Sequence, residues 1–529
     1  MPDLATTSES SKLEPPENQV HEAQPLSKEK VIEVTSSRRL FMSTVIYGAG
    51  MVLSRAASFI MLPIYTRLLT PTDYGLLQML DMTLEVLGLL VSAGWTYGIV
   101  RFYFKAETEE ERRAVISSGF LLNVGLNLVG SVVMAIAAVP IWRYGLSGNG
   151  SPQLVLIAAA NFTVGALTVV PLILLQMQQR ALAHSSAGLA KLILQLSLNI
   201  LFLVVLDMGP KGILLSTLIS NSIIGGALAI WVIKSNGMRI RRRIVRDLRR
   251  FGLPYQVAMA GTFILTFGDR VFLEPMKGLA VVGIYSFAYQ FGFLLDQIGR
   301  APYARAWYPA RYAIVNAPKE FRDAEYNKGV LNYSLILLTT AVGIALFVHP
   351  VLSLFAGSAY RSAADLVPII LVAYVMQAWG EVFQFGIDVS EQTKYSTYAV
   401  WASVAVIIPL YAVLIPYFSA FGAAIATALS FMVRLVCQFI FAQRLWHVNY
   451  RLRPHLRLLL IAAVVAIAAP YLRQPSPWVE SAVMCGLLAI YAVVTWLWVL
   501  DTNERQGLME ALGLLREWLG NRIRRYVHR

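Results

Sequence analysis

Four cationic side chains lie within long apolar stretches of the sequence: Arg55, Lys191, Arg270 and Arg434. An ionisable group near the bilayer centre costs roughly 2.5–3.5 kcal/mol to insert, so such residues usually face a cavity or a partner. A cavity that gathered all four would attract an anion, above all a phosphate or diphosphate, which a guanidinium binds with two parallel hydrogen bonds. We therefore interpret them as candidate substrate-binding residues of a cationic cavity.

Each of these cations also has a structural alternative. Lys191 lies one turn into its apolar stretch, where a lysine more often extends its amine to the membrane surface. Arg270 follows Asp269 and could belong to an ion pair that only stabilises helix packing. Arg55 and Arg434 lie deeper in their stretches, and this position favours exposure to a cavity.

Four acidic residues are embedded in the same way: Glu85, Asp269, Asp296 and Glu381. A carboxyl group in a low-dielectric environment holds a proton more readily and can bind and release it during a transport cycle. Each could equally neutralise a neighbouring arginine. The sequence therefore leaves two roles open for them, ion coupling and charge pairing.

The remaining reactive residue types give weaker signals. Cys437 and Cys485 lie in apolar stretches, and six scattered histidines show no spacing typical of metal ligands. We therefore expect no metal site, no disulfide framework and no cofactor. The aromatic residues at positions 285, 287, 289, 291 and 293 could stack on sugar rings, although aromatic residues in an apolar stretch more often pack or face lipid.

The elements that hold these residues are predicted to be membrane-spanning helices. Of the 529 residues 57% are hydrophobic and only 14% are charged, whereas a soluble domain carries about a quarter charged residues. Fourteen stretches are long enough to span ~30 Å of hydrocarbon, and their continuous hydrophobicity indicates helices rather than a barrel. We predict an all-α polytopic membrane protein, with twelve or thirteen spans as competing counts. The stretches cover about 43–65, 80–103, 116–138, 154–176, 187–206, 211–233, 252–275, 280–300, 330–350, 365–389, 396–416, 420–442, 456–472 and 479–500.

The distribution of positive charge predicts the orientation. If both termini are cytoplasmic, 35 of the 45 Lys and Arg residues fall on cytoplasmic segments, six fall on outside loops and four fall within spans. Positive residues concentrate on the cytoplasmic side of membrane proteins. The net charge of +14 therefore indicates topology rather than nucleic-acid binding, and the predicted location is the bacterial cytoplasmic (inner) membrane.

The chain also repeats internally. Segments 212–220 and 422–430 carry Gly, Thr and Ser at identical offsets, 210 residues apart, and Gly75 and Gly283 occupy equivalent places near the second and eighth spans. Two six-helix lobes in the same membrane orientation are a common transporter plan. The predicted division is a disordered cytoplasmic tail (1–40), an N-lobe (41–235), a basic connector (236–251), a C-lobe (252–445), an appended helix pair (446–503) and a cytoplasmic amphipathic helix (504–529), with an ordinary solvated tail as the alternative for the last.

Two motifs resemble markers of the Wzx-type polysaccharide flippases, which belong to the multidrug/oligosaccharidyl-lipid/polysaccharide exporter superfamily. They are Pro63–Gly75 (PIYTRLLTPTDYG) and Asp269–Ala288, and the segment 422–427 also fits. The resemblance covers about residues 40–445. It implies two six-helix lobes that work by alternating access around a cationic cavity, driven by an ion gradient or the membrane potential. Asp269 and Arg270 fall on the family motif, whereas the appended pair departs from the twelve-helix pattern.

The resemblance implies that this chain is not an enzyme but a flippase for surface polysaccharide, lipopolysaccharide or exopolysaccharide biosynthesis. The implied substrate is an undecaprenyl-diphosphate-linked oligosaccharide, and membrane lipids and the polymerase or chain-length regulator of polysaccharide assembly are candidate partners. A flippase for the peptidoglycan lipid precursor is one alternative, since it would share an arginine-rich cavity and a fourteen-helix plan. A multidrug or cation exporter of the same superfamily is another, although it would need an acidic cavity.

A membrane glycan polymerase or ligase is the least favoured alternative. Such enzymes need a sizeable outside loop, whereas every loop predicted here is short and the longest, about 301–329, has some thirty residues. The sequence also contains no G-x-x-x-x-G-K-[ST] phosphate-binding loop, so we expect no ATP hydrolysis by this chain. The helical bundle itself must therefore do the work.

Overall fold

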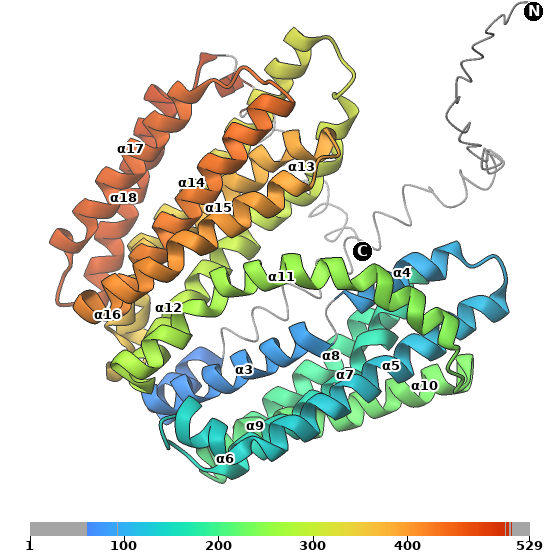
Figure 1. Cartoon of the computed structure of the whole chain (residues 1–529). Helices are drawn as coiled ribbons and strands as arrows, with labels where there is room; N and C mark the ends of the chain where they lie inside the picture. Colours follow the sequence, from blue (N-terminus) through green and yellow to red (C-terminus); the bar gives the residue numbers. More distant parts are fainter. Residues whose placement is uncertain (1–60, 92–93, 503, 507–508, 510–529) are drawn as a thin grey trace, which may run out of the picture.

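The computed structural model describes residues 61–91, 94–502, 504–506 and 509, and no strand occurs among them. The N-terminal helices form one bundle and the later helices a second, with two further helices on its outer side (Figure 1). The first bundle contains α3 (Pro71–Val91), α4 (Trp95–Lys105), α5 (Glu109–Ile136), α6 (Ala138–Pro140), α7 (Pro152–Met177), α8 (Ala181–Ile200), α9 (Gly209–Ser220) and α10 (Gly226–Asn236). The rest of the chain contains α11 (Arg242–Lys277), α12 (Leu279–Leu295), α13 (Ala301–Ala313), α14 (Lys319–Phe355), α15 (Ala363–Val389), α16 (Lys394–Leu445), α17 (Leu452–Ala468) and α18 (Pro477–Trp498).

Eleven helices in the described part of the chain are long and apolar enough to span a membrane. One of them, α16, consists of two helical stretches joined at Ser419, whose φ of 53° bends the chain, and it covers both predicted spans 396–416 and 420–442. The protein is thus a multi-pass helical membrane protein. The count of fourteen stays a prediction. Most of the first span lies within residues 1–60, outside the described residues, and α11, which covers the predicted seventh span, is not one of the eleven.

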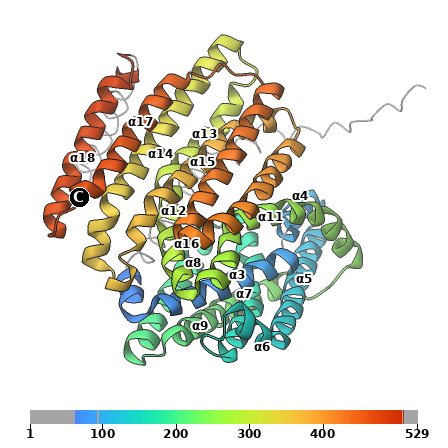
Figure 2. The ribbon, with the colours of Figure 1, turned by 60° about the vertical axis from the view of Figure 1, so that its left-hand side comes forward.

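The two bundles meet at one end and diverge toward the other (Figures 1 and 2). In the first bundle α5 packs along α7, which also contacts α9 and α10; in the second, α15 packs along α16 and also contacts α12 and α14. The 36-residue helix α11 runs between them. Its start contributes Leu248 to the core of the first bundle, and its later part packs against α12 and α16.

The two repeated sequence segments make the same kind of hydrogen bond in both bundles. Thr217 accepts a hydrogen bond from Gln195 Nε2 at 3.0 Å, and the hydroxyl of Thr427 lies 3.0 Å from that of Tyr411. In each case the threonine links its helical segment to the preceding one. Each threonine hydroxyl also donates to the carbonyl four residues earlier in its own helix, so both ends of the hydroxyl are used.

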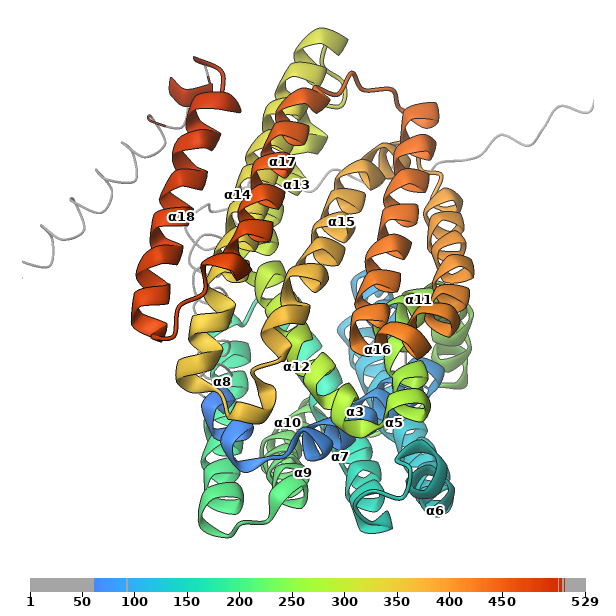
Figure 3. The ribbon, with the colours of Figure 1, turned by 90° about the vertical axis from the view of Figure 1, so that its left-hand side faces the viewer.

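Helices α17 and α18 pack on the outer side of the second bundle, against α14 (Figure 3). Glu480 of α18 is almost fully buried and lies 2.8 Å from His349 Nδ1 of α14. The hydroxyls of Tyr491 and Thr339 lie 3.4 Å apart on the same pair of helices. The appended pair is therefore joined to the bundle by polar contacts within an apolar interface.

Three expected boundaries differ from the structure. The predicted second span, about 80–103, falls on two helices, because α3 ends at Val91 and α4 begins at Trp95, directly after Gly94 with its φ of 85°. Most of the predicted long loop at 301–329 is helical, because α13 occupies Ala301–Ala313 and α14 begins at Lys319. The basic connector is helical from Arg242 onward, since its arginines are good helix formers. The N-terminal tail 1–40 and nearly all of the amphipathic segment 504–529 lie outside the described residues.

Candidate functional site

The first family-like motif builds the start of α3. The Asp73 carboxylate accepts hydrogen bonds from the N–H and hydroxyl of Thr70 at 3.0 and 2.7 Å, and the Thr70 oxygen accepts the N–H of Asp73 at 3.2 Å. Such a reciprocal cap fixes where a helix begins. Pro71 takes the first helical position, where the missing N–H is not needed. The motif therefore determines which residue of α3 meets the other bundle.

That residue is Gly75, which packs against the start of α12. A Cβ on Gly75 would lie 2.0 Å from the carbonyl oxygen of Leu279, and a Cβ on Gly283 would lie 1.9 Å from that of Pro71. The two bundles thus meet backbone to backbone, through glycines at equivalent places of the two repeats. We call this contact the glycine crossing and the end of the molecule that contains it the closed end.

A second set of contacts seals the closed end. Tyr360 follows α14 and donates its hydroxyl to the carbonyls of Leu69 and Thr70, at 3.2 and 2.9 Å. The backbone N–H of Gly357 donates to the Thr66 hydroxyl at 3.2 Å. These bonds join neutral groups at or near helix ends, so water can replace them when the bundles separate.

A cavity of about 300 Å³ lies between the bundles next to this seal. Its walls come from the helix at 61–68, from α3 and α8, and from α12 with the π-helical turn Asp296–Arg300 that follows it. Apolar side chains, including two phenylalanines, make up part of the lining. The polar lining residues are Tyr65, Tyr74, Gln195, Asn199, Gln290 and Gln297.

The described lining of this cavity contains no charged side chain. Lys191 is half-buried on α8, next in sequence to the lining residue Leu192. Arg434 is half-buried on α16, and its Nε has no partner among the described residues. Arg55 lies outside the described residues. Lys191, Arg270 and Arg434 are thus not among the described lining residues of this cavity, and the role of all four cations as substrate contacts stays a prediction.

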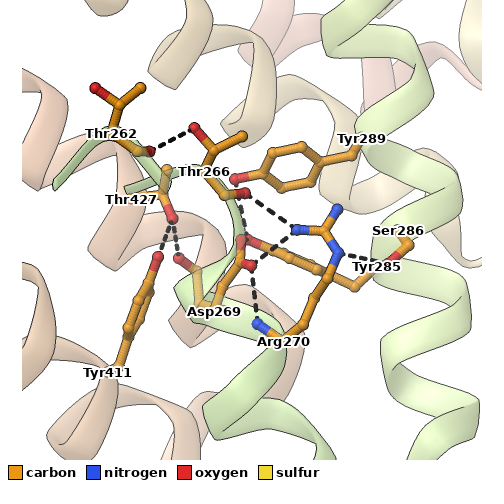
Figure 4. Close-up of polar contacts among 10 residues, drawn as sticks. Thr262, Thr266, Asp269, Arg270, Tyr285, Ser286, Tyr289, Tyr411 and Thr427 are labelled. Atoms are coloured by element: carbon orange, nitrogen blue, oxygen red, sulfur yellow. Dashed lines mark hydrogen bonds and ion pairs between the residues drawn. The ribbon is translucent and has the colours of Figure 1, made fainter. Parts of the chain in front are cut away.

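Arg270 and Asp269 form a buried ion pair near the closed end (Figure 4). Arg270 Nη1 lies 2.9 Å from Asp269 Oδ1, and both side chains are at most 2% exposed. Arg270 also donates through Nε to the Ser286 hydroxyl at 3.0 Å, and its guanidinium carbon lies 4.9 Å from the ring centre of Tyr289. Tyr285 donates to the second oxygen of Asp269 at 2.7 Å. This geometry is that of the structural ion pair, one of the two alternatives for Arg270.

Asp296 and Glu381 are brought together by a residue that sequence reasoning missed, Arg300. Its guanidinium contacts the Asp296 carboxylate through Nε and the Glu381 carboxylate at 2.6 Å through Nη1. Tyr308 also donates to Glu381, at 3.1 Å. The three charged side chains are 21–28% exposed, so solvent reaches them. A signal for Arg300 was present, because it stands four residues after Asp296 in a stretch treated as the end of a span.

The π-helical turn that holds two residues of this cluster supports a functional role for it. Asp296 and Arg300 are its first and last residues, and π-helical turns within α-helices frequently occur at functional sites. The neighbouring Gln297 lines the cavity and donates to Asp296 at 3.0 Å. The charged cluster therefore begins next to a lining residue of the cavity, on the side away from the glycine crossing.

The fourth acidic candidate, Glu85, is exposed on α3. Asp81, one turn earlier, is also exposed. Positions 74, 81 and 85 lie on one face of a helix, given 3.6 residues per turn. Both carboxylates therefore lie on the same face of α3 as the cavity residue Tyr74. They are farther from the closed end, toward the end where the bundles diverge, which we call the open end.

Solved structures with this fold are membrane transporters. A lipid II flippase, MurJ, in an inward closed conformation gives a TM-score of 0.68 at 12% identity, covering 85% of this chain and 99% of that one. An inward-facing multidrug resistance MATE family transporter of the MOP superfamily gives 0.58 at 16% identity, with coverages of 76% and 94%. An outward-facing one gives 0.52 at 18% identity, with coverages of 77% and 94%. At these identities the likeness shows the fold alone.

The sequence itself matches one family model. Among curated protein sequences, none matches this chain. The model of the family described as polysaccharide biosynthesis protein matches residues 40–315, which is just over half of the chain. The matched region includes the capped start of α3, both glycines of the crossing and the Asp269–Arg270 pair. The chain is therefore a member of the polysaccharide biosynthesis protein family.

Proposed function

We propose that this protein translocates undecaprenyl-diphosphate-linked oligosaccharide repeat units across the bacterial inner membrane by alternating access, for surface or exopolysaccharide biosynthesis. The glycine crossing carries this proposal, because it closes one end of an inter-bundle cavity through contacts between two separable bundles. Membership of the polysaccharide biosynthesis family supports a glycan as the cargo.

The crossing is suited to repeated opening. Gly75 and Gly283 allow the two backbones to approach closely, and small residues serve this purpose at helix interfaces in membranes. The hydrogen bonds around Tyr360 and Gly357 are neutral, and each contributes only about 0.5–1.5 kcal/mol net. Breaking the seal therefore needs a few kcal/mol, which the differential binding of a substrate can supply.

The orientation follows from charge. Segments at the open end, such as 234–250, carry most of the Lys and Arg residues, which favours a cytoplasmic location for that end. The conformation described here would then admit the lipid-linked glycan from the cytoplasmic leaflet. Both termini are cytoplasmic in this proposal.

The charged residues are proposed to handle the diphosphate and the coupling ion. Arg55, Lys191, Arg270 and Arg434 supply positive charge, and Arg300 joins them because it is partly exposed and close in sequence to the lining residue Gln297. Here Arg270 and Arg300 are already paired with carboxylates. A diphosphate would have to exchange with those carboxylates, and protonation of Asp269, Asp296 or Glu381 would make such an exchange possible. Glu85 is proposed as a further group for ion coupling.

Depletion of the protein tests the proposal. We expect cells that lose it to accumulate an undecaprenyl-diphosphate-linked oligosaccharide, detected by mass spectrometry of extracted lipids, while surface glycan is lost. Accumulation of the peptidoglycan precursor instead would favour the lipid II alternative, for which the fold likeness to that flippase is the specific observation. An unchanged lipid pool would contradict both.

Single substitutions test the charged residues. We expect Arg55→Ala and Arg434→Ala to abolish glycan export while the protein still inserts into the membrane at parental levels. Normal export from correctly inserted variants would remove these arginines as substrate contacts. Arg361→Ala is a matched control, because Arg361 is exposed at the closed end and away from the cavity lining.

A further inference from the structure

The described wall of the cavity beside the glycine crossing is partly polar and carries no charged side chain. Two amides come from the first bundle, Gln195 and Asn199 of α8, and two come from the second, Gln290 and Gln297. We propose that this cavity binds the saccharide of the lipid-linked substrate through its ring hydroxyls, and that these amides select the sugar. The inference rests on the proposed function and assigns one part of the substrate to one part of the protein.

The buried amide of Asn199 is the strongest indication that the cavity binds a polar ligand. Its side chain is only 2% exposed, and its Nδ2 lies 2.7 Å from the hydroxyl of Tyr65. Its Oδ1 has no hydrogen-bond partner within the part of the chain that the structure describes. Whichever way the amide is turned, one of its two ends stays unpaired. Buried polar groups normally find a partner, and a sugar hydroxyl can serve either end because it both donates and accepts.

The glutamines are held so that one end of each amide is occupied. Gln195 donates its Nε2 to Thr217 at 3.0 Å, and Gln297 donates its Nε2 to Asp296 at 3.0 Å. Gln290 reaches the Tyr74 hydroxyl only at 3.4 Å, which is long for a hydrogen bond. Their carbonyl oxygens are acceptors along the cavity wall. A ring that carries several hydroxyls matches such a set of separated, oriented amides.

Aromatic rings complete the site. Phe287 and Phe293 line the cavity from α12, and Tyr74 faces them from α3 with its ring centre 6.1 Å from that of Phe287. The aromatic residues 285, 289 and 291, which the sequence also marked as possible sugar-stacking residues, are buried in the helix packing instead. Phe287 is itself only 2% exposed and Phe293 is partly exposed, so Phe293 is the ring of this set that a sugar could contact most readily.

The described lining does not supply what a diphosphate needs. A buried anion needs a paired cation or several charge-assisted hydrogen bonds, and the described lining offers neither lysine nor arginine. The nearest charged group along α12 is the Arg300 cluster, which begins at Asp296 beside Gln297. The sugar would therefore enter first and lie toward the closed end, while the diphosphate stays nearer the charged cluster and the open end.

The position of the amides also links selection to transport. A saccharide that contacts Asn199 and Gln290 together touches both bundles, directly beside the crossing that must open. A site built to hydrogen-bond particular hydroxyls discriminates strongly against a sugar that lacks them, since its polar groups are then left unpaired. The correct sugar is thus recognised at the contact that changes during alternating access.

The test compares two lipids on the purified full-length protein. One probe is the lipid-linked glycan extracted from cells depleted of the protein, and the other is bare undecaprenyl diphosphate. Gln290→Met and Gln195→Met keep the length of the side chain and remove its amide. We expect each to weaken binding of the glycan lipid about three- to tenfold, the loss typical of one neutral hydrogen bond, with binding of the bare lipid unchanged. Gln178→Met is the matched control, because Gln178 is exposed at the end of α7, away from the cavity lining.

The other possible results contradict either the inference or the proposed function. Equal weakening for both lipids would overturn the inference, because the amides would then contact the diphosphate end. No change for either lipid would also overturn it, since the cavity would not hold the sugar. If the parent protein binds neither lipid, the proposed function fails as a whole, and that outcome is separate from the first two.

Discussion

Replacing Gly283 by alanine should prevent the two bundles from closing. The new Cβ would lie 1.9 Å from the carbonyl oxygen of Pro71, and real Cβ atoms essentially never approach another heavy atom within 3.0 Å. The start of α12 would have to move about 1 Å or more from α3 to accept it. Overpacking of this kind costs about 1–3 kcal/mol, so the population of the closed conformation should fall about 5- to 150-fold relative to an open one.

The fold of each bundle should survive this substitution. Alanine is the better helix former by about 1 kcal/mol, and the clash is with the other bundle rather than within α12. Gly343→Ala on α14 is the matched control, because a Cβ there would meet nothing within 4 Å. The control should keep both the closed conformation and export.

Spin labels at Lys211 and Arg361, one exposed residue of each bundle near the closed end, would report the separation. The labels require replacement of the native Cys437 and Cys485 by serine. We expect Gly283→Ala to add a longer-distance population that Gly343→Ala lacks, and to reduce glycan export. A Gly283→Ala protein that keeps the parental distances and full export would refute the role assigned to the crossing.

Three further substitutions test the polar contacts. Asp269→Asn should leave Arg270 buried without its counter-ion and lower stability by about 3–5 kcal/mol, seen as a lower thermal unfolding temperature in detergent; joint replacement of both by apolar residues should restore much of it. Arg300→Gln should reduce export more than Arg300→Lys, because lysine keeps the charge between the two carboxylates. Ser117→Ala should lower the free energy of unfolding by about 1–3 kcal/mol, because the buried Ser117 hydroxyl accepts the N–H of Arg239 at 2.7 Å and holds the connector on α5. Unchanged unfolding temperatures would contradict the expectations for Asp269→Asn and Ser117→Ala. Equal export by the two Arg300 variants would contradict the expectation for Arg300.

The family-like motif around residues 63–75 shows how sequence and structure relate in this protein. Its Thr-Pro-Thr-Asp pattern could be interpreted as a helix start from the sequence, since capping depends on residues a few positions apart. The partner of Gly75 could not, because Leu279 lies some two hundred residues later and the contact depends on how two bundles dock. The same reason explains why Arg300 was missed: its second partner, Glu381, lies on another helix.

Sequence alone determined that the chain is a multi-pass helical membrane protein of two related halves, because hydrophobicity, charge bias and repeated small residues are local properties that need no contact partner. It also identified Asp269, Arg270, Asp296 and Glu381 as embedded charges that must find a cavity or a partner. Only the tertiary structure decided whether each charge faces a cavity or pairs with a partner. Charges on different helices meet or stay apart according to the packing of the bundles. That packing pairs Arg270 and Arg300 with carboxylates, and the cavity it leaves beside the crossing has amides and no charged side chain in its described lining.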